Sequence, residues 1–186
     1  MIGKRLEYLE RAVYVCPFCG LSVFESKDDI ITCKRCKRQI RHLPSKELEG
    51  VGFEFPYRYV ADWYEYQEKF VSQLSLSDCI ETPMYRESVG LWEVILFDRK
   101  RLIDKKSEIE LYGDRFVIMT SEETLTLPFA AISAVTVLGK NKLNIYFGER
   151  VYQIKGDKRF NALKYVNLFY HEHNLRKGEQ YEFLGL

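Results

Sequence analysis

From about residue 89 onward, apolar and polar positions alternate in short runs, which is the pattern of half-buried β-strands. Turn residues separate these runs at 113–114, 121–122, 139–141 and 148–149. The predicted strands cover residues 91–97, 108–112, 115–120, 123–127, 131–137, 142–147 and 150–154. Because short turns join neighbouring strands in antiparallel order, this half of the chain predicts a seven-stranded antiparallel β domain.

After the last predicted strand, the apolar positions change to helical spacing. Asp157 is a suitable N-cap, and Phe160, Leu163 and Tyr170 recur on one side of the segment that follows it. We therefore expect a C-terminal helix that caps a β-barrel, with the whole domain spanning residues 88–186.

A second amphipathic segment lies in the middle of the chain. Val60, Trp63 and Gln67 recur at helical spacing, and Pro56 prevents a continuous helix before them. Such an aromatic face can be imagined as a ligand cage, but a helix that clamps one domain onto another is the simpler interpretation. We assign residues 46–87 to a linker that contains this helix.

Near the N-terminus, four cysteines stand in two C-x2-C pairs separated by thirteen residues: Cys16, Cys19, Cys33 and Cys36. Two intervening residues let both thiolates of a pair face one ion, and Gly20 supplies a backbone angle that such turns often need. Four thiolates fill the tetrahedral shell of Zn²⁺ and leave no position for water or substrate. We expect one structural zinc per chain, with a rubredoxin-type or [4Fe–4S] iron centre as the alternative.

The β-rich pieces around these cysteines are too short to build a core of their own. Residues 1–45 therefore predict a zinc ribbon, a small unit that needs its metal to fold. The fifth cysteine, Cys79, stands alone and is expected to be a small buried hydrophobic residue.

The amino-acid composition indicates the class of protein, and the absence of a signal peptide or an apolar span indicates its cellular location. Hydrophobic residues make up 46% and charged residues 30% of the 186 residues, as in ordinary globular proteins that build a sizeable core. The N-terminus carries charges throughout and lacks the apolar core of a signal peptide, and no apolar run is long enough to cross a bilayer. We expect a cytoplasmic protein.

The second cysteine pair lies within a basic run formed by Lys34, Arg35, Lys37 and Arg38. A zinc ion with four thiolates is formally a dianion, so these cations can offset its charge. Nucleic-acid contact is the alternative, but no exposed aromatic residues are interleaved with the run and the net charge of the chain is only +1. We therefore favour the local role over binding to nucleic acid.

Seven strands with a C-terminal helix resemble a pleckstrin-homology (PH) or GRAM-type domain over about residues 88–174. In that family, the basic loop between the first two strands often holds anionic lipid headgroups. The corresponding segment here is residues 98–106, and the resemblance implies a lipid-binding or anion-binding site at Arg99, Lys100, Arg101, Lys105 and Lys106. A solvated loop without a ligand is the simpler alternative.

The order of ribbon, helix and β domain is similar to the C-terminal extension of some bacterial 1-acyl-glycerol-3-phosphate (lysophosphatidate) acyltransferases. This resemblance rests on the four cysteines, on Asp62, Trp63 and Gln67, and on the segment 162–166. That family uses a His-x4-Asp pair as its general base, whereas His42 is followed at this distance by Glu47. The resemblance implies a part of such an enzyme without its catalytic residues.

Together these patterns predict a mainly β (α+β) protein with an N-terminal four-cysteine zinc ribbon, an aromatic linker helix and a seven-stranded PH-like β-barrel. The expected function is that of a non-catalytic adaptor module, recruited to anionic membrane lipid or to a partner protein and peripheral at the membrane. A zinc-ribbon protein that binds nucleic acid is the second hypothesis. An enzyme whose carboxylates gather only in three dimensions is the third, and no sequence motif supports it.

Overall fold

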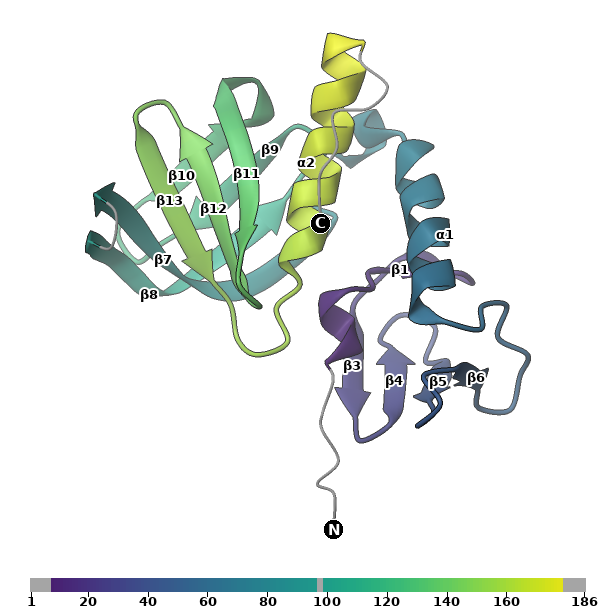
Figure 1. Ribbon diagram of the computed structural model, residues 1–186. Coiled ribbons are helices and arrows are strands. Elements are labelled where there is room, and N and C mark those ends of the chain that lie inside the picture. Colours follow the sequence, from purple (N-terminus) through teal and green to yellow (C-terminus); the bar gives the residue numbers. More distant parts are fainter. Residues whose placement is uncertain (1–7, 97–98, 179–186) are drawn as a thin grey trace. The chain divides into compact units, whose positions relative to one another are not determined.

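The computed structural model describes residues 8–96 and 99–178 (Figure 1). The chain divides into two compact units between Gln73 and Leu74. We expected boundaries at 45/46 and 87/88, but the middle helix belongs to the first unit and is not a separate linker. Each unit is described by itself below.

The first unit contains a two-stranded and a four-stranded antiparallel sheet. The small sheet pairs β1 (Val15–Cys16) with β2 (Gly20–Leu21). The larger sheet has the order β3 (Phe24–Lys27), β4 (Ile30–Cys33), β5 (Gln39–His42) and β6 (Leu48–Gly50). Because β6 pairs with β5, residues assigned to a linker from the sequence continue the sheet of the ribbon.

Helix α1 (Val60–Ser72) packs its buried face on this unit. That face consists of Trp63, Gln67 and Val71, which are one helical turn apart. Trp63 is fully buried and shares one hydrophobic core with Phe24 and with the cysteines of the ribbon. The expected amphipathic helix is present, and its apolar side completes the core of the first unit.

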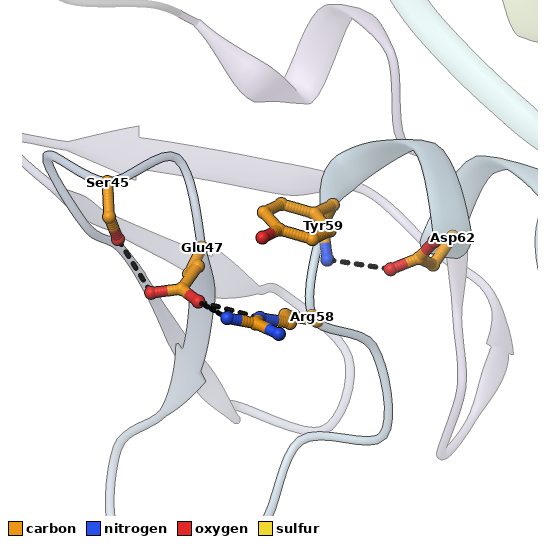
Figure 2. A network of polar contacts seen from close by, with 5 residues as sticks. All are labelled: Ser45, Glu47, Arg58, Tyr59 and Asp62. Carbon is orange, nitrogen blue, oxygen red and sulfur yellow. Dashed lines mark hydrogen bonds and ion pairs between the residues drawn. The ribbon is translucent and has the colours of Figure 1, made fainter.

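Hydrogen bonds to two carboxylates, those of Asp62 and Glu47, fix the start of α1, as Figure 2 shows. The carboxylate of Asp62 accepts the backbone N–H of Tyr59 (2.9 Å), which satisfies a donor at the helix N-terminus. Glu47, which precedes β6, accepts a hydrogen bond from the Ser45 hydroxyl (2.8 Å) and one from Arg58 Nε (2.6 Å). These contacts lower the pKa of Glu47, and the bond from Arg58 joins the residue before β6 to the segment that leads into α1.

The second unit is one curled, seven-stranded antiparallel sheet with the order β10-β9-β8-β7-β13-β12-β11. Its strands are β7 (Tyr85–Leu96), β8 (Arg99–Leu111), β9 (Arg115–Met119), β10 (Thr124–Pro128), β11 (Ile132–Leu138), β12 (Lys142–Phe147) and β13 (Arg150–Lys155). The first and last strands pair with each other, so β10 and β11 form the two edges. The predicted seven strands and C-terminal helix, the layout implied by the PH resemblance, are therefore present.

The segment between the first two strands differs from the expectation. Residues 98–106 were predicted to form a loop, but β8 begins at Arg99, and Leu96 of β7 pairs with it. Residue 98 and the expected end of the first strand at residue 97 lie outside the described residues. The basic residues 99–106 thus belong to a long, bulged strand whose side chains largely face water.

Helix α2 (Ala162–Lys177) covers the sheet and contributes Tyr165, Leu168 and Phe169 to its core. Its N-cap is Asn161, whose side chain accepts the backbone N–H of Lys164 (3.1 Å), and not Asp157 as the sequence indicated. Among the described residues, no helix combines the length and the apolar character that a membrane span requires. Three further short helical turns lie at Leu9–Arg11, Leu76–Cys79 and Phe129–Ala131.

Candidate metal centre and basic strand

The four cysteines of the two C-x2-C pairs converge in the first unit. Cys16 ends β1 and Cys33 ends β4, while Cys19 and Cys36 lie in the turns that follow these strands. Their four Sγ atoms all lie within 4.8 Å of one another. Residues 20–32 run through β2, β3 and most of β4, and the pairing of these strands brings the second cysteine pair back to the first.

The sulfur positions fit a tetrahedral metal ion. A Zn–S bond of about 2.3 Å places two sulfur atoms of a tetrahedron about 3.8 Å apart. The distance from Cys16 Sγ to Cys36 Sγ is 3.7 Å, and that from Cys19 Sγ to Cys33 Sγ is 3.6 Å. These four cysteines therefore form a possible single metal site, and an ion at its centre would have four sulfur ligands.

Both cysteine turns use the same unusual backbone conformation. Gly20, directly after Cys19, has φ +79°, and Lys37, directly after Cys36, has φ +63°. The left-handed conformation at Gly20 confirms the reason given for this glycine from the sequence. At Lys37 a side chain tolerates the same angle, so the second turn has the geometry of the first without its glycine.

Without metal, the thiols differ in acidity. Burial raises the pKa of Cys16 strongly and that of Cys19 to about 11. Burial also opposes ionisation of Cys36, but hydrogen bonds from the Arg38 backbone, Cys33 and the Arg38 side chain outweigh it and lower the pKa of Cys36 to about 6. Because a metal binds thiolates, its binding displaces the protons of Cys16 and Cys19.

Helix α1 holds the segment that leads into the first cysteine. Gln67 Oε1 accepts the backbone N–H groups of Tyr14 (2.7 Å) and Val15 (3.0 Å), and its Nε2 donates to the carbonyl of Ala12 (3.0 Å). The Trp63 indole N–H donates to the Val15 carbonyl (2.8 Å). The sequence placed both residues on one helix face, but it did not reveal this role, because their partners lie about fifty residues away.

The basic run of the ribbon has local contacts. Lys34 pairs with Glu25 (3.1 Å), and Arg35 donates to the carbonyl of Cys19 (2.7 Å). Arg38 lies 4.3 Å from the centre of the Phe18 ring and hydrogen-bonds Cys36, which supports the charge-offset interpretation. Phe18 is 40% exposed, so an aromatic ring from the first cysteine turn lies beside the basic run, although none is interleaved with the run in the sequence.

The five cations proposed as a lipid site lie along β8 in two groups. Arg99, Lys100 and Arg101 begin the strand, and Lys105 and Lys106 lie further along it, beyond Asp104. A strand rises about 3.3 Å per residue, so the two groups are on the order of 20 Å apart. This separation exceeds a Debye length of about 8 Å at physiological salt, and the five residues therefore do not act as one charge cluster.

Apolar side chains accompany the first group. We define the β7–β8 end as Ile95, Leu96, Arg99, Lys100, Arg101 and Leu102. Ile95 is 60% exposed, Leu96 62% and Leu102 42%. Arg101 pairs with Glu93, and Lys100 donates to the Gln153 side chain (2.6 Å), whereas the Arg99 side chain forms no hydrogen bond or ion pair within the described residues. Exposed leucine and isoleucine thus lie beside cations at one end of the sheet.

Comparisons with known proteins show a likeness to solved structures only. No protein-family model and no curated protein matches the chain. Among solved structures, the chain is similar to the solution structure of the N-terminal PH domain of ARAP2 protein from human, with 17% sequence identity and a TM-score of 0.41. The match covers 54% of this chain and 90% of that one. The sites described above rest on residues of this chain alone.

Proposed function

We propose that the chain is a non-catalytic binding module whose second unit attaches to anionic membranes through the β7–β8 end. The observation that carries this proposal is the exposure of Ile95, Leu96 and Leu102 beside three cations. Exposed side chains of this size at the end of one strand pair are costly in water, and a membrane interface accommodates both kinds of group.

The energies of the two contributions are similar. Each Lys or Arg near an anionic surface contributes about 1 kcal/mol, and each buried CH₂ group contributes about 0.8 kcal/mol. Arg99 is available without breaking a hydrogen bond or ion pair among the described residues, whereas Arg101 has to share its charge with Glu93. The expected result is weak, reversible and salt-sensitive attachment.

In the first unit, the proposed ion is structural zinc. Four cysteine sulfurs at tetrahedral spacing fill the coordination shell of Zn²⁺, so neither water nor a substrate has a coordination position. The ribbon strands are only two to four residues long. Zinc binding then supplies folding free energy that these short strands lack.

Attachment to an anionic membrane also fits an accessory role beside a membrane-lipid enzyme. The sequence resemblance to the C-terminal extension of lysophosphatidate acyltransferases implies such a role, with Trp63 and Gln67 among the residues that carry it. In this chain both residues hold the segment before Cys16 in place. Their role in the proposed module is therefore structural.

Vesicle sedimentation tests the membrane proposal. The chain is mixed with vesicles of phosphatidylcholine alone and with vesicles that also contain phosphatidylserine, at low and at physiological salt. We expect sedimentation only with the anionic vesicles, and a loss of it in Leu96→Ser combined with Arg99→Glu. Leu138→Ser on β11 is the matched control, because Leu138 is 43% exposed and lies at an edge of the same sheet. Equal sedimentation of both variants contradicts the proposal.

Nucleic-acid binding by the first unit is the second candidate function. The contact between Arg38 and the exposed Phe18 favours it, because an aromatic ring beside cations is the arrangement on which single-stranded bases stack. Fluorescence anisotropy with single-stranded DNA and RNA tests this candidate. Salt-dependent binding that Phe18→Ala abolishes would support it, and equal binding by Phe18→Ala and the unchanged chain would exclude Phe18 as a stacking platform.

A further inference from the structure

One edge of the seven-stranded sheet is open. Strand β11 pairs with β12 on one side, and among the described residues no strand pairs with its other side (Figure 1). Apart from the pairing with β12, residues 133–138 form no hydrogen bond between backbone groups within the part of the chain that the structure describes. A row of backbone N–H and C=O groups therefore faces outward, and such a row can pair with a further strand.

The side chains at this edge are neutral and partly exposed. β11 contains neither a charged residue nor a proline. Helix α2 packs against the strand, in which Ile132 and Val135 are buried, but it leaves the end of the strand open. Val137 is 36% and Leu138 43% exposed, and Thr136 is exposed as well. Exposed apolar residues on an uncharged edge mark a site at which another strand adds.

The opposite edge of the sheet, β10, is protected. It ends at Pro128, which has no backbone N–H to donate, and Glu122 and Glu123 directly precede it. β11 has only a bulge near its start, and residues 134–138 pair with β12 in regular register. The regular part of β11 is therefore the edge at which the addition of a strand is favoured.

Charge points to a second copy of the chain as the source of the added strand. Because β11 is uncharged, two copies of it meet without like charges opposite each other. The whole chain carries a net charge of only +1, so long-range repulsion between two copies is small as well. An edge that selects a charged partner needs charges of its own, and β11 has none.

Two β11 strands are complementary when they pair in antiparallel direction about a twofold axis at Thr136. The two threonines then lie opposite each other, which is a favourable cross-strand pair. Val137 lies opposite Val135 of the second copy, and Leu138 opposite its Ala134. Both exposed apolar side chains are thus placed against apolar residues. A twofold axis uses the edge of both copies, so pairing stops at the dimer.

We propose that the second unit forms a twofold dimer in which the β11 strands of two chains pair about Thr136. This inference goes beyond the proposed function, which concerns the β7–β8 end and the first unit. A contact between two such short strands buries less than the roughly 1,200 Å² at which stable interfaces begin, so the dimer is weak. The vesicle test above, run in the low micromolar range, therefore reports on single chains, and Leu138→Ser remains its control.

Sedimentation equilibrium of the full chain, with zinc and a reductant, tests the association from micromolar to millimolar concentration. We expect the average mass to rise from that of one chain toward that of two, and no further. Thr136→Lys/Leu138→Lys should weaken dimerisation at least about tenfold, because lysine then opposes lysine at the axis and the Leu138 contact is lost in both copies. The amide spectrum of β12 checks that this variant is folded.

The matched control is Thr124→Lys/Thr126→Lys on β10. It adds the same charge at two exposed positions of the other edge and should leave the dimerisation constant unchanged. A chain that stays monomeric at the highest concentration leaves the β11 edge to another partner, and this result overturns the inference. Equal association of the two lysine variants also overturns it.

A disulfide locates the contact. In the proposed register, cysteines at position 136 face each other across an antiparallel pair, where Cα atoms are about 4.5–5.5 Å apart and a disulfide can form. Under mild oxidation of the zinc-loaded chain, Thr136→Cys should give a covalent dimer and Thr126→Cys on β10 much less. The unchanged chain, in which Cys79 is free, gives the background. Equal cross-linking of the two cysteine variants contradicts pairing through β11.

Discussion

The indole N–H of Trp63 donates a hydrogen bond to the carbonyl of Val15, the residue directly before the first cysteine of the metal site. The neighbouring Gln67 satisfies three backbone groups of the same segment. Residues 12–15 thus use side chains of α1 as their hydrogen-bond partners. Helix α1 therefore helps to hold the metal centre in place, and substitutions of Trp63 or Gln67 should alter the position of Cys16.

Removing these partners should destabilise the first unit. Gln67→Ala removes the side-chain partner of two backbone N–H groups and one carbonyl, and each buried group that is left unsatisfied costs about 1–3 kcal/mol. We expect a loss of several kcal/mol, seen as faster hydrogen exchange of the Tyr14 and Val15 amides. Gln67→Glu keeps the acceptor but turns a carboxylate oxygen toward the Ala12 carbonyl, so an intermediate effect is expected.

The control for that series is Glu68→Ala, a change of an exposed residue on the same helix. It should alter the free energy of unfolding by less than about 0.5 kcal/mol. Equal exchange rates of the Tyr14 amide in Gln67→Ala and Glu68→Ala would show that Gln67 does not support the segment before Cys16.

Removal of the metal should unfold the first unit and spare the second. Structural zinc in small units supplies on the order of 10 kcal/mol of folding free energy, and the core around Trp63 includes Cys16 and Cys33. With a chelator and a thiol reductant, we expect amide protection to vanish in β3, β4 and α1. The amides of β7 and β13 should stay protected, because their core contains no metal ligand. Persistent protection of β4 would refute the structural role of the ion.

The buried Tyr165 predicts a specific loss of stability at alkaline pH. Its hydroxyl donates to Glu87 Oε2 (2.6 Å), which also accepts from Lys164 (2.7 Å). Burial, together with the nearby Glu87 carboxylate, raises the pKa of Tyr165 well above its ordinary value of 10.0. A raised folded-state pKa gives stability that is complete below pH 10 and is lost as the pH rises from there through the folded value.

Chemical unfolding at a series of pH values measures this effect. Below pH 10, Tyr165→Phe should be less stable than the unchanged chain by about 1.5–3 kcal/mol, the contribution of a hydrogen bond to a charged group. The difference should shrink as the pH rises above that value. Tyr170→Phe, on the same helix, is the matched control. A difference for Tyr165→Phe that does not change with pH would show that this hydroxyl does not titrate with unfolding.

Much of the second unit was predictable from local pattern. Turn residues such as Gly139 and Gly148 mark strand ends, and alternation between them gives each strand its buried side. The basic segment 99–106 was wrongly predicted to be a loop. Its bulges break the alternation of apolar and polar residues, and a run of charged residues is more typical of loops than of strands. The backbone of this segment pairs with β7 all the same, because most of its charged side chains are exposed to water.

The metal site was predictable for a different reason. Spacing within each C-x2-C pair is a local constraint, so the sequence contains it, and the four sulfurs do converge. The contacts of Gln67 with Tyr14 and of Arg38 with Phe18 depend on tertiary packing, and no local sequence pattern predicts them. The pairing of Lys155 with Gly90 likewise depends on the register of two strands that lie about sixty residues apart in the sequence.

The most direct test of the membrane proposal places a reporter at the β7–β8 end. Leu96→Trp is compared with Leu175→Trp on α2, because both leucines are 62% exposed. Each variant is mixed with phosphatidylserine vesicles that contain brominated lipid, and quenching is measured relative to the unchanged chain, which has Trp63 and Trp92. The account predicts additional quenching for Leu96→Trp and none for Leu175→Trp. No additional quenching at Leu96, or equal quenching at both positions, would contradict attachment through the β7–β8 end.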